Sequence, residues 1–282
     1  MSTAAALLAP AIARLRAAGV ADPVRDARLL LAHALDLPAD RLTLHLHDPL
    51  PPGTAARMDA LIARRAARQP VSQIIGARLF WGRQFIVTPD VLDPRPETET
   101  LIEAALTAPF ARVLDLGTGS GVILLTLLAE RARASGLGVD ISPPALDVAR
   151  RNAQALGLEG RAQFHLSDWF TAVEGRFDLI IANPPYIAAA EMPALAPETR
   201  EWEPALALTP GGDGLGAYRI IAQGAAAFLN PGGRLLMEIG PAQGAAVAAL
   251  CRAGGLAGVQ VLPDMDGRDR VVAAAGAVGG RG

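Results

Sequence analysis

The sequence predicts an α/β protein with a doubly wound, mostly parallel sheet of seven strands, preceded by a small all-helical domain and a β-hairpin connector. Three observations lead to this prediction. Apolar residues recur at helical spacing through residues 1–75. Residues 76–95 are rich in aromatic and β-branched residues around a glycine. From residue 110 onward, short apolar runs alternate with helical stretches, which is typical of a parallel sheet covered by helices on both faces.

The first 75 residues indicate several helices. Asp22 and Pro23 form a helix start signal, because Asp is a good N-cap and proline fits the first helical turn. Residues 49–53 interrupt the pattern, and a further helix is expected over residues 54–68. The helical spacing is carried by Leu7, Leu8, Ile12, Leu15, Leu29, Leu30, Leu31 and Leu35.

The connector is expected as a hairpin over residues 79–87, followed by a segment that leads into a helix. Pro94 and Pro96 hold this approach extended, and Glu97 and Glu99 lie near the N-terminal end of the helix. We therefore expect a helical domain over residues 1–75, a hairpin over 76–95 and an α/β domain over 96–282.

Strands of the main sheet are expected at residues 112–116, 137–140, 163–166, 179–182 and 234–239. Helices are expected at 122–133, 145–156 and 217–229, and a terminal hairpin pairs 259–262 with 270–274. Ligands of open α/β sheets bind outside the carboxyl ends of the strands. Functional residues are therefore expected at these strand ends.

Composition excludes several classes of function. Hydrophobic residues make up 51% and charged residues 19%, as expected of a folded chain. The net charge of −2 disfavours binding of nucleic acid through bulk phosphate neutralisation. All 26 basic residues are arginine, so a lysine Schiff base is excluded. One cysteine and four scattered histidines predict neither a disulfide nor a metal site. With no membrane-spanning run and no signal peptide, a cytoplasmic location is expected.

The first strand ends in a glycine loop made of Gly117, Thr118, Gly119, Ser120 and Gly121. Such loops let a ligand approach the following helix closely, although many serve only as turns. Val122 stands where the dinucleotide fingerprint has its third glycine, and the lysine of a P-loop is missing. The acid before the loop, Asp115, suits a cationic or amine-bearing ligand better than a pyrophosphate.

The next two strand ends carry carboxylates. Asp140 lies 19 residues after Gly121, where a carboxylate accepts hydrogen bonds from ribose hydroxyls. The alternative, a helix cap, is better filled by Ser142. Asp168 is placed to accept from an adenine amino group, with Trp169 or Phe170 covering the ring. An Asp-aromatic pair by itself more often marks a turn with a core anchor.

The fourth strand ends in Asn183, Pro184, Pro185 and Tyr186, the most informative residues of the chain. The prolines fix the direction of nearby carbonyl groups. The Asn183 side chain and the Pro184 carbonyl then offer two acceptors to one planar NH₂ group, and Tyr186 offers a flat face. A Pro-Pro pair alone would indicate only a rigid loop. A nucleotide pocket without phosphate ligands beside such a clamp indicates S-adenosylmethionine, which has adenine, ribose and a sulfonium but no phosphate.

At this point a family resemblance is plain. Residues 111–275 resemble a class I methyltransferase domain, and the whole chain resembles the release-factor glutamine methyltransferase family (PrmC, formerly HemK). The motifs follow in the family's order, as the residue ranges 94–99, 115–121, 167–170, 183–186, 202–204, 231–233, 238–240 and 266–270.

The resemblance implies N5-methylation of the glutamine in the Gly-Gly-Gln motif of bacterial class 1 peptide chain release factors. It also implies that residues 1–75 are a substrate-docking domain and residues 96–282 an S-adenosylmethionine-dependent methyltransferase domain, joined by the hairpin over 76–95. By the resemblance, the glycine loop, Asp140 and Asp168 hold the cofactor, and the segment over residues 94–99 closes over it. Asn183 lies where cofactor and substrate meet, and Asn183, Pro184, Pro185 and Tyr186 hold the glutamine amide. No general base is assigned.

Two alternatives stay open from the residues alone. An adenine-N6 methyltransferase of nucleic acid would fit the same NH₂ clamp, but it needs a basic recognition surface. Residues 1–75 hold nine arginines and six acids, a net of +3, without a groove-reading motif. The rest of the chain has a net charge of −5. This division suits a protein partner better than a phosphate backbone, so no stable nucleic-acid or membrane binding is expected. The third reading is a non-enzymatic binding module, which the complete set of strand-end residues argues against.

Overall fold

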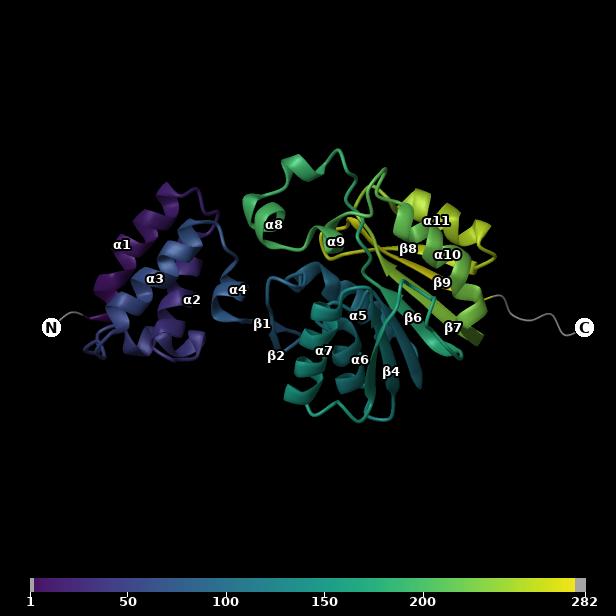
Figure 1. Cartoon of the computed structure of the whole chain (residues 1–282), viewed down its shortest axis with the longest axis horizontal. Coiled ribbons are helices and arrows are strands. Elements are labelled where there is room, and N and C mark those ends of the chain that lie inside the picture. The colour runs from purple at the N-terminus through teal and green to yellow at the C-terminus, as the bar shows by residue number, and fades with distance from the viewer. Residues whose placement is uncertain (1–2, 277–282) are drawn as a thin grey trace, which may run out of the picture. The chain divides into compact units, whose positions relative to one another are not determined.

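The computed structural model describes residues 3–276, which form two compact units (Figure 1). The first unit comprises the residues up to 77 together with residues 196–202. The second comprises residues 78–195 and the residues from 203 onward. The chain therefore leaves the second unit after Leu195 and returns to it at Glu203.

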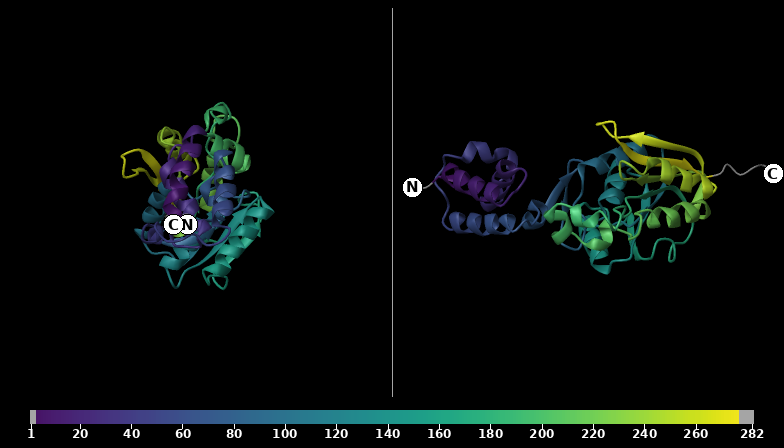
Figure 2. Two further views of the ribbon diagram at one scale, coloured as in Figure 1. Left: turned by 90° about the vertical axis from the view of Figure 1, so that its left-hand side faces the viewer. Right: turned by 90° about the horizontal axis from the view of Figure 1, so that it is seen from above.

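The first unit is helical, as predicted. Its helices are α1 (Ala4–Ala17), α2 (Pro23–Ala34), the 3-10 helix η1 (Ala39–His45), α3 (Thr54–Ala66) and α4 (Val71–Ile75). Helices α1, α2 and α3 pack side by side, as the purple and blue ribbons of Figure 2 show. The predicted start of α2 is confirmed, because an Asp22 side-chain oxygen accepts from the Arg25 amide at 3.1 Å. Leu15, Leu30, Leu31 and Leu42 are fully buried in its core.

A short helix from the second half of the chain, α8 (Pro197–Trp202), belongs to this first unit. The buried Arg65 guanidinium contacts Asp26 at 2.7 Å and Glu198 at 2.9 Å. Arg68 contacts the other Glu198 oxygen at 2.6 Å. The Gln73 side chain also donates to the Trp202 carbonyl at 2.8 Å. These buried contacts hold residues 196–202 on the helical unit.

The predicted hairpin consists of β1 (Ala77–Phe80) and β2 (Arg83–Ile86), and all of it after Ala77 belongs to the second unit. The turn between its strands uses positive φ angles at Trp81 and Gly82. The proline-rich segment then enters the 3-10 helix η2 (Pro96–Thr98) and α5 (Glu99–Leu106).

The main sheet has seven strands in the order β5-β4-β3-β6-β7-β9-β8. Strands β3 to β7 pair in parallel, whereas β9 pairs antiparallel with both β7 and β8. The predicted mostly parallel sheet with a terminal hairpin is therefore confirmed. The strands are β3 (Arg112–Leu116), β4 (Ser135–Asp140), β5 (Ala162–Leu166), β6 (Phe177–Ala182), β7 (Leu229–Glu238), β8 (Ala257–Pro263) and β9 (Asp269–Ala275).

Helices cover both faces of the sheet, as the doubly wound pattern requires (Figure 1). One face packs against α5, α6 (Val122–Glu130) and α7 (Pro143–Ala155). The other packs against α10 (Gly216–Phe228) and α11 (Gly244–Ala253). Helix α11 was not predicted from the sequence. Strand order reverses at β3, which lies between β4 and β6, and this switch point is where a ligand is expected.

Within residues 3–276, no helix is both long enough and apolar enough to cross a membrane. Over the same range, the His, Cys, Asp and Glu side chains form no group of three or more that is placed to hold a metal ion.

Candidate active site

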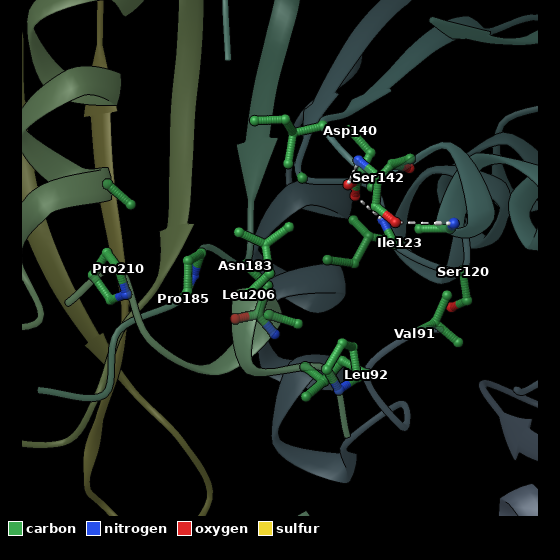
Figure 3. A pocket seen from close by; sticks show the side chains of 18 of the residues that line it. Val91, Leu92, Ser120, Ile123, Asp140, Ser142, Asn183, Pro185, Leu206 and Pro210 are labelled. Atoms are coloured by element: carbon green, nitrogen blue, oxygen red, sulfur yellow. Dashed lines mark hydrogen bonds between the residues drawn. The ribbon is translucent and has the colours of Figure 1, made fainter. Parts of the chain in front are cut away.

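A cavity of about 370 Å³ opens at the carboxyl ends of the parallel strands, entirely within the second unit. Most of the glycine loop lines it together with Asp140, Asp168 and Asn183, so strand ends that are far apart in the sequence meet at one site. Figure 3 shows Asp140 and Ser142 together in one part of the cavity, and Asn183 with Pro185 in another.

The glycine loop is shaped by positive φ angles at Gly117, Gly119 and Gly121. Gly117, Thr118, Gly119 and Ser120 line the cavity, as predicted, but Gly121 does not. A Cβ on Gly121 would lie 3.1–3.2 Å from side-chain carbons of Leu125 and Ala149. Gly121 therefore permits close packing of α6 against α7 and does not itself line the cavity.

The acid that precedes the loop does not face the cavity either. Asp115 is fully buried, and one of its oxygens accepts from the Thr118 hydroxyl at 2.7 Å. Burial raises the pKa of this carboxyl to about 7. The expectation that Asp115 meets a cationic ligand is therefore not met, and its role is to hold the loop from beneath.

Asp140 points toward the loop from the end of β4. Its two oxygens accept from the amides of Gly119 and Ser142, each at 2.9 Å, as the dashed lines of Figure 3 show. Ser142 caps α7 by accepting from the Ala145 amide, so Asp140 is not needed as the cap. Each carboxylate oxygen keeps a lone pair for a further donor, and burial raises the pKa of Asp140. The site thus fits a pair of ribose hydroxyls.

The two aromatic candidates that follow β5 lie in different surroundings. Asp168 and Trp169 line the cavity, and the Trp169 backbone adopts a φ of 48°, which is uncommon for a bulky residue. The Ser167 hydroxyl donates to the Trp169 carbonyl at 2.9 Å and so fixes this turn. Phe170 instead stacks on Phe228, with ring centroids 4.8 Å apart. Of the two rings, only Trp169 lies beside the cavity.

Of the four residues after β6, two line the cavity and two do not. Asn183 and Pro185 line the cavity, whereas Pro184 is buried and Tyr186 is half-buried against the core. The Asn183 amide nitrogen donates to the Thr98 hydroxyl at 3.3 Å. The Tyr186 carbonyl accepts from the Gln243 side chain at 2.9 Å, which fixes the end of the turn. Burial raises the pKa of Tyr186 to about 12, so its phenol stays neutral.

Part of the cavity wall was not predicted. The segment after α8, with the short helix α9 (Ala205–Leu208), and the first turns of α10 line the cavity, as does the chain at residues 90–92. Arg95 joins the two segments, because its guanidinium contacts both Glu203 oxygens, at 2.7 and 2.8 Å. The sequence signal for this wall is the motif at residues 202–204, one of the motifs that carry the family resemblance. The unpredicted lining residues here are Asp90, Val91, Leu92, Pro204, Leu206, Ala207, Thr209, Pro210, Gly216, Ala217 and Ile220.

A buried side-chain amide that was not predicted links the hairpin to the glycine loop through hydrogen bonds. Asn152 on α7 is fully buried. Its side-chain oxygen accepts from the Ile86 amide at 2.7 Å, and its nitrogen donates to the Ser120 carbonyl at 2.9 Å. The signal was a polar residue on the inner face of an amphipathic helix.

These residues fit an adenosyl group with a charged sulfur better than a phosphate-bearing nucleotide. Acceptors for hydroxyl and amino groups stand at two strand ends, and Trp169 adds a flat apolar surface. Among the lining residues that the structure describes, the one arginine is Arg95, and it is paired with Glu203. A phosphate would need donors and positive charge here.

Comparison with known proteins defines the class. Residues 90–213 match the family model of the methyltransferase small domain. The fold is similar to the crystal structure of a methyltransferase from Pyrococcus furiosus, with a TM-score of 0.53 and 16% identity, covering 78% of this chain and 98% of that one. Together with the curated relatives described next, this match shows that the chain is an S-adenosylmethionine-dependent methyltransferase.

The particular family follows from the rest of the chain. Residues 6–76 match the PrmC N-terminal domain. The release factor glutamine methyltransferase of Cereibacter sphaeroides is 66% identical over 96% of this chain and 98% of that protein. That of Agrobacterium fabrum is 42% identical over 96% of each chain. The chain belongs to the release factor glutamine methyltransferase family.

Proposed function

We propose that this chain methylates the side-chain amide nitrogen (N5) of the glutamine in the Gly-Gly-Gln motif of bacterial class 1 release factors, and does so in the cytoplasm. The observation that supports this most is the place of Asn183 and Pro185, on a rigid turn in the same cavity as Asp140. A planar amide bound there is adjacent to the nucleoside end of the cofactor.

The cofactor end is assigned to residues whose contacts leave acceptors free. Asp140 receives the ribose hydroxyls, Asp168 the adenine amino group, and Trp169 a ring face. The positive φ angles at Gly117 and Gly119 bring the backbone close to the ligand. S-adenosylmethionine, when bound, supplies a methyl group on a positively charged sulfur.

The amide end is assigned to the turn after β6. An amide nitrogen is a weak nucleophile, because its lone pair is delocalised into the carbonyl. Two acceptors on its hydrogens, the Asn183 side-chain oxygen and the Pro184 carbonyl, favour a pyramidal nitrogen and aim its lone pair. Holding the reacting atoms at about 3–3.5 Å supplies much of the acceleration. The surplus proton leaves to water. Tyr186 is not assigned to take it, because burial keeps its phenol neutral and its side chain lies against the core.

The first unit is assigned to docking of the release factor. Its match to the PrmC N-terminal domain covers most of its residues, and residues 1–75 carry a net charge of +3. A mildly basic surface steers an acidic protein face toward the site.

Labelled S-adenosylmethionine offered to three acceptors tests the function. The acceptors are a purified release factor, the same factor with its motif glutamine changed to alanine, and duplex DNA. We expect label in the first acceptor alone. Label in DNA would favour the adenine-N6 alternative, and label in the alanine variant would contradict the glutamine assignment.

A further inference from the structure

Thr98 is a buried hydroxyl that local structure does not use. It stands at the N-cap of α5 with 2% of its surface exposed. A threonine in this position ordinarily accepts from the first turn of its helix, yet Thr98 makes no such bond. A buried hydroxyl needs other partners, and they come from two distant strands.

The first partner is Asn183, whose side-chain nitrogen donates to the Thr98 oxygen at 3.3 Å. The second is Glu238, at the end of β7. Burial raises the pKa of its carboxyl to about 7, and the interaction with the Thr98 hydroxyl opposes this by lowering that pKa. Glu238 has 1% of its surface exposed, and its Oε2 atom lacks a partner among residues 3–276.

The direction of this chain of hydrogen bonds follows from what each group can do. Because the Asn183 nitrogen donates to the Thr98 oxygen, the single Thr98 hydrogen can go to Glu238, whose carboxylate only accepts once it is ionised, above its pKa of about 7. The Thr98 oxygen is then left as an acceptor, and only the NH₂ side of the Asn183 amide satisfies it. The Asn183 oxygen consequently faces away from Thr98.

We propose that Thr98 and Glu238 are positioning residues that keep the Asn183 amide from flipping, so that the site selects a glutamine over a glutamate. The proposal rests on the proposed role of Asn183 in holding the glutamine amide. With its oxygen toward the substrate, Asn183 accepts from an NH₂ group. A flipped amide would present its own NH₂, which repels a glutamine NH₂ and donates to a carboxylate.

Thr98→Val tests this, because valine keeps the shape of threonine and removes the hydroxyl. Two quantities are measured for each enzyme at a pH of about 8, where the Glu238 carboxylate is ionised: kcat on the release factor, and inhibition by the factor whose motif glutamine is changed to glutamate. We expect a kcat about tenfold lower and a preference for glutamine over glutamate about tenfold weaker, as one misdirected hydrogen bond gives. The dissociation constant of S-adenosylmethionine, measured by calorimetry, should stay within about twofold.

Two further variants separate positioning from a merely structural role. Thr98→Ser keeps the hydroxyl and should restore most of the preference for glutamine. Glu238→Gln should weaken the preference less than Thr98→Val does, because a glutamine amide can donate to Thr98 as well as accept. It also keeps the test open should Thr98→Val fail to fold.

Thr126→Val is the matched control. Thr126 on α6 is likewise buried, and its hydroxyl lacks a partner among the described residues. The same substitution there should change neither kcat nor the preference. An unchanged preference in both Thr98→Val and Glu238→Gln would overturn the proposal. A wild-type enzyme that fails to methylate the release factor would instead contradict the proposed function itself.

Discussion

The two ends of the cavity are built in different ways. At the cofactor end, main-chain amides of neighbouring residues fix Asp140, and glycines shape the loop that faces it. At the amide end, Asn183 donates to Thr98, which lies 85 positions earlier in the chain and interacts with the buried carboxyl of Glu238 on another strand. The first end depends on local backbone and the second on long-range side-chain contacts, so substitutions should affect them differently.

The largest effect is expected at the amide end. Asn183→Ala removes one of the two acceptors for the glutamine NH₂ and should lower kcat by about 10²–10³, the usual cost of one preorganised group. Cofactor affinity by calorimetry should change little. A near-normal rate on the release factor would contradict the clamp.

Asp140→Ala tests the cofactor end. Loss of the ribose acceptor should weaken S-adenosylmethionine binding by about 30-fold, because hydrogen bonds to a charged group are the stronger ones. Saturating cofactor should restore much of kcat, in contrast to Asn183→Ala. Unchanged affinity would remove Asp140 from the site.

A smaller effect is expected from the wall that joins the ends. Glu203→Gln weakens the contact with Arg95 and should raise KM for the cofactor by about fivefold. Glu201→Gln breaks an exposed pair with Arg200 and serves as the control, since such pairs contribute little. Equal KM values for the two variants would show that the wall does not depend on this ion pair.

Asp115→Asn should change stability and not the rate. Burial raises the pKa of Asp115 in the folded chain from 3.8 to about 7. Between these pH values the unfolded chain releases the proton and the folded chain keeps it, so this group makes the protein less stable as pH rises. Denaturant unfolding at several pH values should therefore show that the free energy of unfolding of the variant rises relative to that of the wild type from pH 4 to 7. A constant difference would contradict the raised pKa.

Local motifs were predictable because each lies at the end of a strand that hydrophobic pattern reveals. The ends of β3, β4, β5 and β6 fell where expected, and parallel pairing brought their side chains to one edge of the sheet. Strand β7 was predicted to begin at Arg234, because Pro231 and the two glycines that follow it are typical of a turn. In the structure the strand begins at Leu229. It pairs with β6 there through a shift in register.

The sequence by itself determined the fold class, the glycine loop, Asp140 and the turn at Asn183, since backbone propensity and strand order suffice for these. Only the tertiary structure decided that Asp115 supports the loop without facing the cavity and that Trp169, not Phe170, lies beside it. The same holds for residues 196–202 joining the helical unit and for Thr98 reaching Asn183. The physical reason is that burial and hydrogen-bond partners depend on residues far apart in the chain, which no local pattern encodes.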